Sequence, residues 1–168
     1  NAGYDYLDLI CNQLSVELKK SNKIEGLLGE TTYKDLQIGF VKPNEFINNS
    51  GRTLSLIKKY RVKELNDVLV IHDDMDLEPG EVKLKIGGGH SGHRGLKDII
   101  NKVGDDFVRL RLGIGHPPVK EETNAWVIKK PSPKEKEGLN NAFTKANESL
   151  DQMLNKEWLI AMNDLHTK

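Results

Sequence analysis

One short apolar run, residues 68–71, most constrains the fold of this chain, because polar residues bound it on both sides. A run of this kind predicts a buried parallel strand. It ends at His72, Asp73, Asp74 and Asp76, so that a histidine and three carboxylates lie at the carboxyl end of the strand. In open α/β sheets ligands bind at that end of the strands. We therefore expect the chemistry of the protein here.

A glycine-rich loop at residues 87–95 follows the next expected strand, residues 82–86. Five glycines within nine residues are costly unless the backbone needs left-handed dihedrals or a ligand approaches it closely. The loop holds His90 and His93. Its glycine spacing also matches a dinucleotide-binding fingerprint, but no acidic residue closes the following strand. A nucleophile elbow around Ser91 is another alternative, although His93 stands where that motif has glycine.

Helices and strands alternate along the chain. Apolar residues at helical spacing predict amphipathic helices at residues 4–18, 50–60, 96–103, 139–153 and 158–165. Short segments within residues 24–41 predict antiparallel strands, and residues 107–114 predict one more strand. This alternation predicts an α/β protein. The length of 168 residues suits one domain with a sizeable core.

Charge and cysteine content restrict the classes of partner. Lys plus Arg and Asp plus Glu both number 25, so only local patches can attract a polyanion. Lys83 and Lys85 share one face of their strand, as Arg109 and Arg111 do, and such rows suit phosphate binding. The single cysteine, Cys11, is expected in the core. No apolar run approaches the roughly 18 residues of a membrane span, and no signal peptide is visible, so we expect a cytoplasmic protein.

A metal site is a further alternative, because imidazole and carboxylate groups bind divalent metals. Its ligands would come from His72, Asp73, Asp76, His90 and His93. Two histidines three residues apart in a loop are weak evidence for such a site. Asp74 and Asp76 suit turns. This leaves Asp73 as the carboxylate that we most expect to act on a ligand.

Four segments together resemble the bacterial peptidyl-tRNA hydrolase family in order and spacing, namely residues 46–51, 70–77, 87–96 and 109–117. The resemblance covers essentially the whole chain. It implies a single α/β domain over residues 1–168, with a twisted mixed sheet flanked by helices. It also implies hydrolysis of the ester between a peptide and the 3′ end of tRNA, which recycles tRNA from stalled translation. No metal, organic cofactor or membrane is implied, and the full-length protein is expected to be a monomer.

The resemblance assigns roles to individual residues. In this family a histidine acts as general base on water, and an aspartate holds that histidine in the right tautomer. Asp73 matches the aspartate. Asn48 matches the asparagine that holds the peptide portion and the water, and Phe46 matches the aromatic residue at the site of the tRNA end. His93 matches the histidine of the glycine loop.

The remaining matches concern tRNA and the start of the chain. Lys85 and Arg111 match the pair that binds the 5′ phosphate of the tRNA. Arg94 replaces the usual asparagine, which is expected to shift substrate contact toward phosphate or ribose. Asn1 and Gly3 match the end of a His-Asn-x-Gly motif. The general base is therefore expected directly before Asn1, the first strand is expected to be missing, and the chain as given is predicted to be inactive.

Two other classes of function stay open at this point. A non-catalytic RNA-binding relative, of the splicing-partner type, needs only the basic face. The presence of Asp73, Asn48 and His93 favours an enzyme over such a binder. A metal-dependent hydrolase that uses the histidines and aspartates would lose its activity in a chelator.

Overall fold

The computed structural model describes residues 1–44, 50–117 and 130–167. These residues form two compact units, each assembled from segments that are far apart in the sequence. The first unit consists of Asn1–Tyr6, Val70–Lys85 and Arg109–Lys168, and the second of Leu7–Leu69 and Ile86–Val108. Within the described residues, no helix combines the length and the apolarity that crossing a membrane would require.

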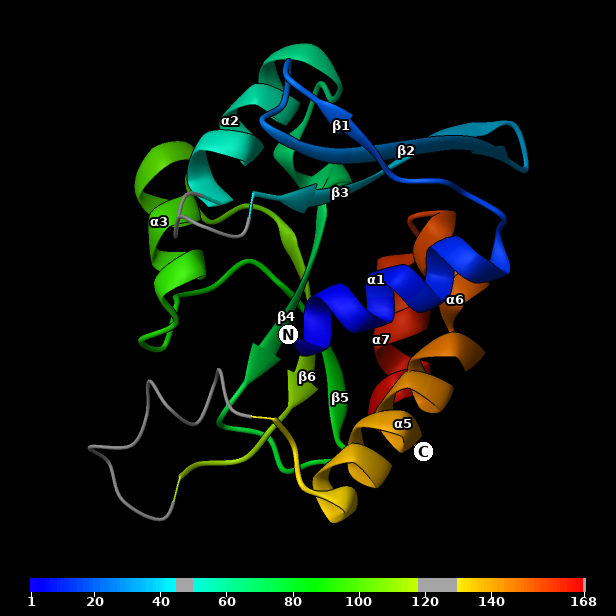
Figure 1. Ribbon diagram of the computed structural model, residues 1–168, viewed down its shortest axis with the longest axis vertical. Coiled ribbons are helices and arrows are strands. Elements are labelled where there is room, and N and C mark those ends of the chain that lie inside the picture. The colour runs from blue at the N-terminus through cyan, green and yellow to red at the C-terminus, as the bar shows by residue number, and fades with distance from the viewer. Residues whose placement is uncertain (45–49, 118–129, 168) are drawn as a thin grey trace. The chain divides into compact units, whose positions relative to one another are not determined.

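The apolar run belongs to a three-stranded sheet (Figure 1). Its strands are β4 (Leu69–Asp74), β5 (Val82–Ile86) and β6 (Val108–Gly113), in the order β4-β6-β5. Every residue of the middle strand β6 except Arg111 is buried. Such a strand can be apolar on both faces, which explains why its sequence alternates less than that of an exposed strand.

The strands β4 and β6 are parallel. The N–H groups of Val108 and Ile114 donate to the carbonyls of Val68 and Asp74, with the same offset along the chain at both places. The predicted parallel strand at residues 68–71 is therefore confirmed. It is longer than expected, because the chain stays in the sheet as far as Asp74.

The strand β5 runs antiparallel to β6, so the sheet is mixed. The N–H of Gly113 donates to the carbonyl of Glu81, and the N–H of Gly87 donates to the carbonyl of Phe107. The start of β5 thus lies beside the end of β6, and the end of β5 beside the start of β6. Among the strands that the structure describes, β5 pairs with β6 alone, so its other side is an edge of the sheet.

Three helices of the first unit follow the sheet in sequence: α5 (Pro133–Glu148), α6 (Leu150–Leu154) and α7 (Trp158–Thr167). The hydroxyl of Ser132 accepts the N–H of Glu135, and Pro133 occupies the first turn, both typical of a helix start. The helix expected at residues 139–153 thus begins earlier, at Pro133, and is interrupted at the buried Ser149.

Tyr6 joins the start of the chain to α5. Its side chain is fully buried, and its ring stacks on Phe143 with 5.3 Å between the ring centroids. The hydroxyl donates to Oδ1 of Asn147 over 3.0 Å, so the buried polar group is satisfied. Burial raises the pKa of this hydroxyl above its usual value. These contacts hold residues 1–6 against α5.

The second unit contains an antiparallel sheet and a pair of packed helices (Figure 1). The strands are β1 (Lys19–Ser21), β2 (Gly26–Tyr33) and β3 (Leu36–Pro43), the paired helices are α2 (Ser50–Tyr60) and α3 (Arg94–Val103), and a short 3-10 helix, η1 (Leu65–Asp67), leads to β4. The expected strands within residues 24–41 and the helix at residues 50–60 are confirmed.

The helix α1 (Ala2–Gln13) ends earlier than the predicted 4–18. Ser15 has a φ of 55°, and the N–H of Val16 donates to the carbonyl of Cys11 over 2.8 Å. A left-handed residue just after a helix, with such a bond, is a common helix end. Cys11 is buried, as expected of a core residue.

Candidate functional site

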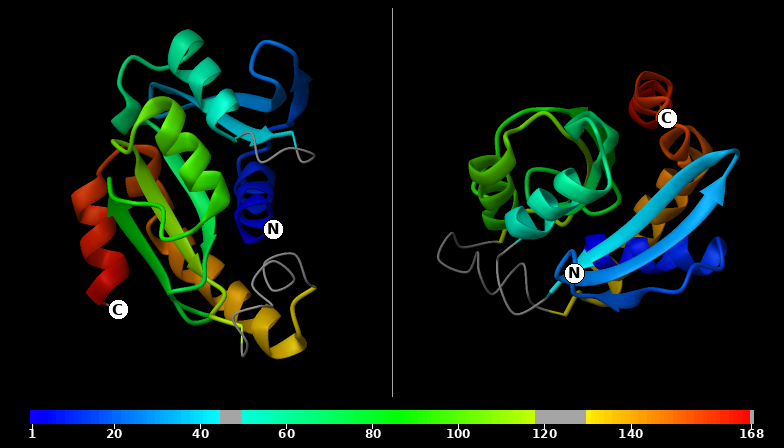
Figure 2. Two further views of the ribbon diagram at one scale, coloured as in Figure 1. Left: turned by 90° about the vertical axis from the view of Figure 1, so that its left-hand side faces the viewer. Right: turned by 90° about the horizontal axis from the view of Figure 1, so that it is seen from above.

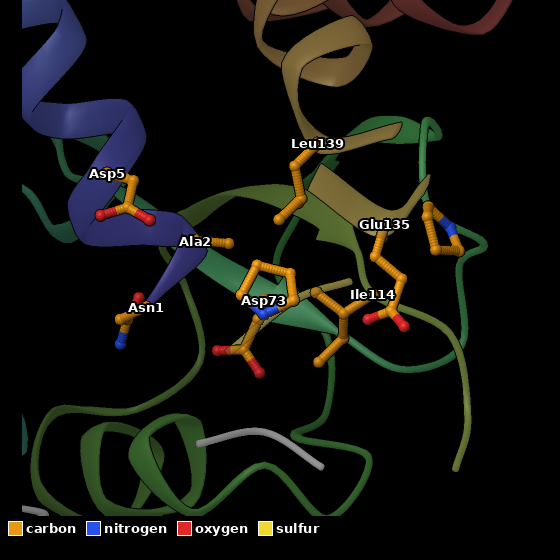
Figure 3. Close-up of a pocket in the computed structure, with 10 residues that line it drawn as sticks. Asn1, Ala2, Asp5, Asp73, Ile114, Glu135 and Leu139 are labelled. Atoms are coloured by element: carbon orange, nitrogen blue, oxygen red, sulfur yellow. The ribbon is translucent and has the colours of Figure 1, made fainter. Parts of the chain in front are cut away.

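Asp73 lies at the carboxyl end of β4, half-buried, and lines a pocket in the first unit (Figure 3). The cavity has a volume of about 70 Å³. Asn1 and Asp5 from the start of the chain line it on one side, and Ile114, Glu135 and others on the other. The carboxylate that the sequence singled out therefore faces a cavity of a size that a few waters or a small chemical group could fill.

Glycines let the walls of this pocket approach closely. A Cβ on Gly3 would lie 2.4 Å from the carbonyl oxygen of Ile71 in β4, so the first turn of α1 can lie on the strand only with glycine there. A Cβ on Gly138 would lie 2.8 Å from Cβ of Pro79, which explains a glycine inside α5. Both contacts place backbone beside the pocket where a side chain would push it away.

Asn1, Asp5 and Glu135 line the pocket but were not predicted as site residues. Oδ1 of Asn1 accepts the N–H of Tyr4 over 3.2 Å, so this side chain caps α1 and thereby fixes its own position. Asp5 and Glu135 come from segments 130 residues apart in the sequence. No local pattern could have paired them with Asp73, and only the fold brings the three carboxylates to one cavity.

The other two carboxylates near the end of β4 support the structure around it. Oδ2 of Asp74 accepts a hydrogen bond from Nε of Arg111 over 2.7 Å, in a largely buried ion pair. Oδ1 of Asp74 accepts the backbone N–H of Asp76 over 2.8 Å, which closes a turn. Asp76 in turn lies 2.8 Å from Nε2 of His116 at the surface. Asp74 and Asp76 thus form the turn that their positions in the sequence predicted.

The two expected phosphate ligands lie on neighbouring strands of the sheet. Lys85 is exposed on β5, and Arg111 on β6 is partly exposed and held by Asp74. Arg109 differs from the expected pattern, because its side chain is only 2% exposed. Arg109 therefore does not join Arg111 in an exposed row that could bind phosphate. The period of two places both on one face of β6, but that face is covered at Arg109.

The glycine-rich loop belongs to the second unit and uses left-handed backbone. Gly87, Gly88 and Gly92 have φ values of 70°, 111° and 81°, which a side chain would strain. Nδ1 of His90 accepts the N–H of Gly92 over 3.0 Å. Nδ1 of His93 accepts the N–H of Leu96 over 3.2 Å and so caps α3. Each of these two histidines thus uses a ring nitrogen to stabilise the loop.

The start of α3 lies next to the start of α2. A Cβ on Gly95 would lie 3.1 Å from Cε1 of His93 and 3.7 Å from Oγ of Ser50. The N–H of Gly51 donates to Oδ2 of Asp98 over 2.8 Å, which fixes the first turn of α2. Arg94, the first residue of α3, is exposed. Two further expected site residues, Phe46 and Asn48, lie outside the described residues.

The metal alternative requires several ligands in one place. Within residues 1–44, 50–117 and 130–167, no group of three or more His, Cys, Asp or Glu side chains is arranged to hold an ion. His72 is buried, and its Nδ1 lies 2.8 Å from the carbonyl oxygen of Asp73, where a ring N–H donates to it. This histidine therefore holds the backbone at the end of β4.

The chain is similar to peptidyl-tRNA hydrolases from several bacteria. The Leptothrix cholodnii enzyme is 36% identical over 169 residues, which cover 100% of this chain and 79% of that one. The Delftia acidovorans enzyme is 39% identical over 144 residues, covering 85% and 70%. The crystal structure of peptidyl-tRNA hydrolase from Acinetobacter baumannii matches with a TM-score of 0.94 and 30% identity, over 99% of this chain and 85% of that one.

These similarities confirm the expected α/β fold with mixed sheets flanked by helices. They lend no support to the expectation that the first strand and the general base are missing, because the family model named peptidyl-tRNA hydrolase matches residues 1–168. The match extends over the glycine-rich loop and over both strands with the candidate phosphate ligands. The chain belongs to the peptidyl-tRNA hydrolase family.

Proposed function

We propose that this protein hydrolyses the ester bond between the peptide and the tRNA of peptidyl-tRNA, with Asp73 as the carboxylate that orients the general base. The observation that carries the proposal is the place of Asp73, at the carboxyl end of a parallel strand and in the wall of a pocket. The proposal is also supported by the family match, because the peptidyl-tRNA hydrolase model covers residues 1–168. The release of tRNA from stalled translation follows from this reaction.

The chemistry requires one activated water. A neutral histidine takes a proton from the water, whose oxygen attacks the ester carbonyl carbon and forms a tetrahedral intermediate. The intermediate collapses with cleavage of the bond to the 3′ oxygen of tRNA, which leaves with the proton from the histidine. A carboxylate hydrogen-bonded to that histidine fixes its tautomer and stabilises its charged form. Asp73 is proposed for this role.

His93 is proposed to bind substrate. Because its Nδ1 accepts the N–H of Leu96, the neutral ring carries its proton on Nε2. A general base needs an unprotonated nitrogen toward the water, so this tautomer suits contact better than proton abstraction. The sequence resemblance gives Asn48 and Phe46 contacts to the peptide portion and the tRNA end, and Arg94 a contact to phosphate or ribose.

The identity of the general base is the finer part of this proposal. The resemblance gives this role to the histidine of a His-Asn-x-Gly motif and gives His93 a substrate contact instead. Peptidyl-tRNA hydrolysis by the protein and by its His93→Ala variant tests this. A raised KM with kcat nearly unchanged in His93→Ala supports the substrate contact. Cleavage that His93→Ala abolishes would instead make His93 the base.

Lys85 and Arg111 are proposed to bind the 5′ phosphate of the tRNA. Both are cationic residues on neighbouring strands, and Asp74 holds Nε of Arg111 and so orients its guanidinium group. The protein is further proposed to act as a single-domain monomer in the cytoplasm. Sedimentation and the cooperativity of unfolding check the monomer and the single domain.

Hydrolysis of an N-acetylated aminoacyl-tRNA, followed by gel electrophoresis of the released tRNA, tests the function. The wild-type protein should cleave this substrate, and Asp73→Asn should lower the rate by about 10²- to 10⁴-fold. A non-catalytic RNA-binding relative, which the family match does not favour, would bind the tRNA with either residue at position 73 and cleave it with neither.

A further inference from the structure

The helix α7 covers the edge of β5 that does not pair with β6. The backbone N–H of Leu84 donates to Nε2 of His166 in α7 over 3.2 Å. Figure 2 shows α7 running beside β5. Because Nε2 accepts this bond, the neutral ring of His166 carries its proton on Nδ1. His166 is exposed, so it closes an unpaired strand edge and can still offer a hydrogen-bond donor to a ligand.

Three cationic residues from other elements act electrostatically on His166. Lys83 lies on β5, Arg111 on β6 and Lys145 on α5. Burial and then the charge of Lys83 lower the pKa of His166, and Lys145 and Arg111 lower it further. Among the described residues, the side-chain charges that shift this pKa are all positive. The formal net charge of the whole chain is zero, so this positive potential is local.

We propose that Lys83, Lys145 and His166 form a phosphate-binding surface at the β5 edge, which holds the tRNA backbone beyond the 5′ phosphate. This inference rests on the proposed function, because it extends the contact assigned to Lys85 and Arg111. Lys83 and Lys85 are both exposed, on the same face of β5. Residues two apart in a strand are separated by about 7 Å. The two lysines can therefore bind two separate phosphates of one strand.

The arrangement favours a nucleic-acid backbone over a single free anion. The three groups come from β5, α5 and α7, so they form an extended surface on a rigid frame. Phosphates arranged along a chain can contact such a surface at several points, whereas one free phosphate can contact only a part of it. Because Nδ1–H of His166 is a donor in the neutral ring, the contact does not require protonation. Bound phosphate would nevertheless offset the charge of Lys83.

Binding of deacylated tRNA to the wild-type protein as a function of salt tests this surface. Lys83→Ala and Lys145→Ala should each weaken binding roughly three- to tenfold, and each should reduce the slope of log affinity against log salt by about one. In hydrolysis of peptidyl-tRNA the loss should appear in KM and leave kcat unchanged. Lys136→Ala is the matched control. Lys136 is exposed on the same helix, and the nine residues between it and Lys145 make about two and a half turns, which places it on the opposite side of the helix.

A second readout follows His166 directly. In a carbon-detected NMR titration, the pKa of His166 should rise when tRNA is bound, and Lys136→Ala should not alter this rise. The proposed surface would be contradicted if both lysine variants kept the wild-type tRNA affinity and salt slope while the protein hydrolysed its substrate normally. Equal competition by inorganic phosphate and by tRNA phosphates would overturn its assignment to RNA. A wild-type protein that cleaves no peptidyl-tRNA would contradict the proposed function instead.

Discussion

The end of β4 and the glycine-rich loop both contain histidines or aspartates that the sequence suggested as candidates for catalysis or ligand binding. In the structure these residues have different roles in the two regions. In the loop, His90 and His93 both accept backbone N–H groups and so stabilise their own segment. At the end of β4, Asp74 and Asp76 form such structural contacts, whereas Asp73 lines a pocket. A reactive residue type is thus weak evidence for catalysis. Its surroundings in the fold distinguish the two roles.

The largest effect is expected at Asp73. Asp73→Asn keeps the size of the side chain and removes the carboxylate that would stabilise a charged histidine. We expect kcat for peptidyl-tRNA hydrolysis to fall by about 10²- to 10⁴-fold, with the free energy of unfolding nearly unchanged. A similar loss on Asp76→Asn, which sits in an exposed ion pair, would remove the distinction between the two carboxylates.

A smaller effect, on stability, is expected at Asp74. Asp74→Ala removes the partner of the largely buried Arg111 guanidinium and the acceptor of the Asp76 N–H. The free energy of unfolding in urea should fall by about 2 kcal/mol. Asp74→Asn should restore part of this loss, because its amide oxygen can still accept the N–H of Asp76. Unchanged stability in Asp74→Ala would show that this carboxylate has no structural role.

The cap of α3 should contribute less. His93→Ala removes the acceptor for the N–H of Leu96, which should lower the free energy of unfolding by about 1 kcal/mol. His93→Asn supplies another capping side chain and should recover the stability. Recovery of stability without recovery of substrate affinity in His93→Asn would separate the two roles of the residue. Full stability in His93→Ala would argue against the cap.

The smallest effect is expected at the surface pair of Asp76 and His116. Both side chains are about half exposed or more, so solvent screens their attraction. Asp76→Ala should change the free energy of unfolding by no more than about 0.5 kcal/mol. A loss as large as that of Asp74→Ala would mean that the turn after β4 depends on this pair as well.

The sequence predicted the regular elements well where local signals were strong. The helix α2 has the predicted bounds of 50–60, and β2 and β3 lie in the region where antiparallel strands were expected, joined by the left-handed residues Lys34 and Asp35. The end of α1 was mispredicted because Ser15, and not a glycine, adopts the left-handed conformation there. The strand β1 was missed because Lys19–Ser21 has no apolar pattern, and its pairing with β2 defines it.

The candidate site was only partly predictable. Asp73 could be singled out because a strand end is a local feature of the sequence. The burial of Arg109 and the approach of Asp5 and Glu135 to one cavity depend on long-range packing. The same holds for His166 and Leu84, which lie 82 residues apart in the sequence and share a hydrogen bond. Such relations follow from the tertiary fold, and periodicity carries no information on them.

The pH dependence of single-turnover hydrolysis tests the role of Asp73 most directly. The wild-type protein should show an acid limb from the general-base histidine, whose pKa a neighbouring carboxylate raises above its usual value of about 6.5. In Asp73→Asn the limb should move to lower pH and the plateau should fall by about 10²-fold or more. Asp76→Asn should keep both. An Asp73→Asn profile with the plateau and limb of the wild type would contradict the assignment of Asp73 as the carboxylate that orients the base.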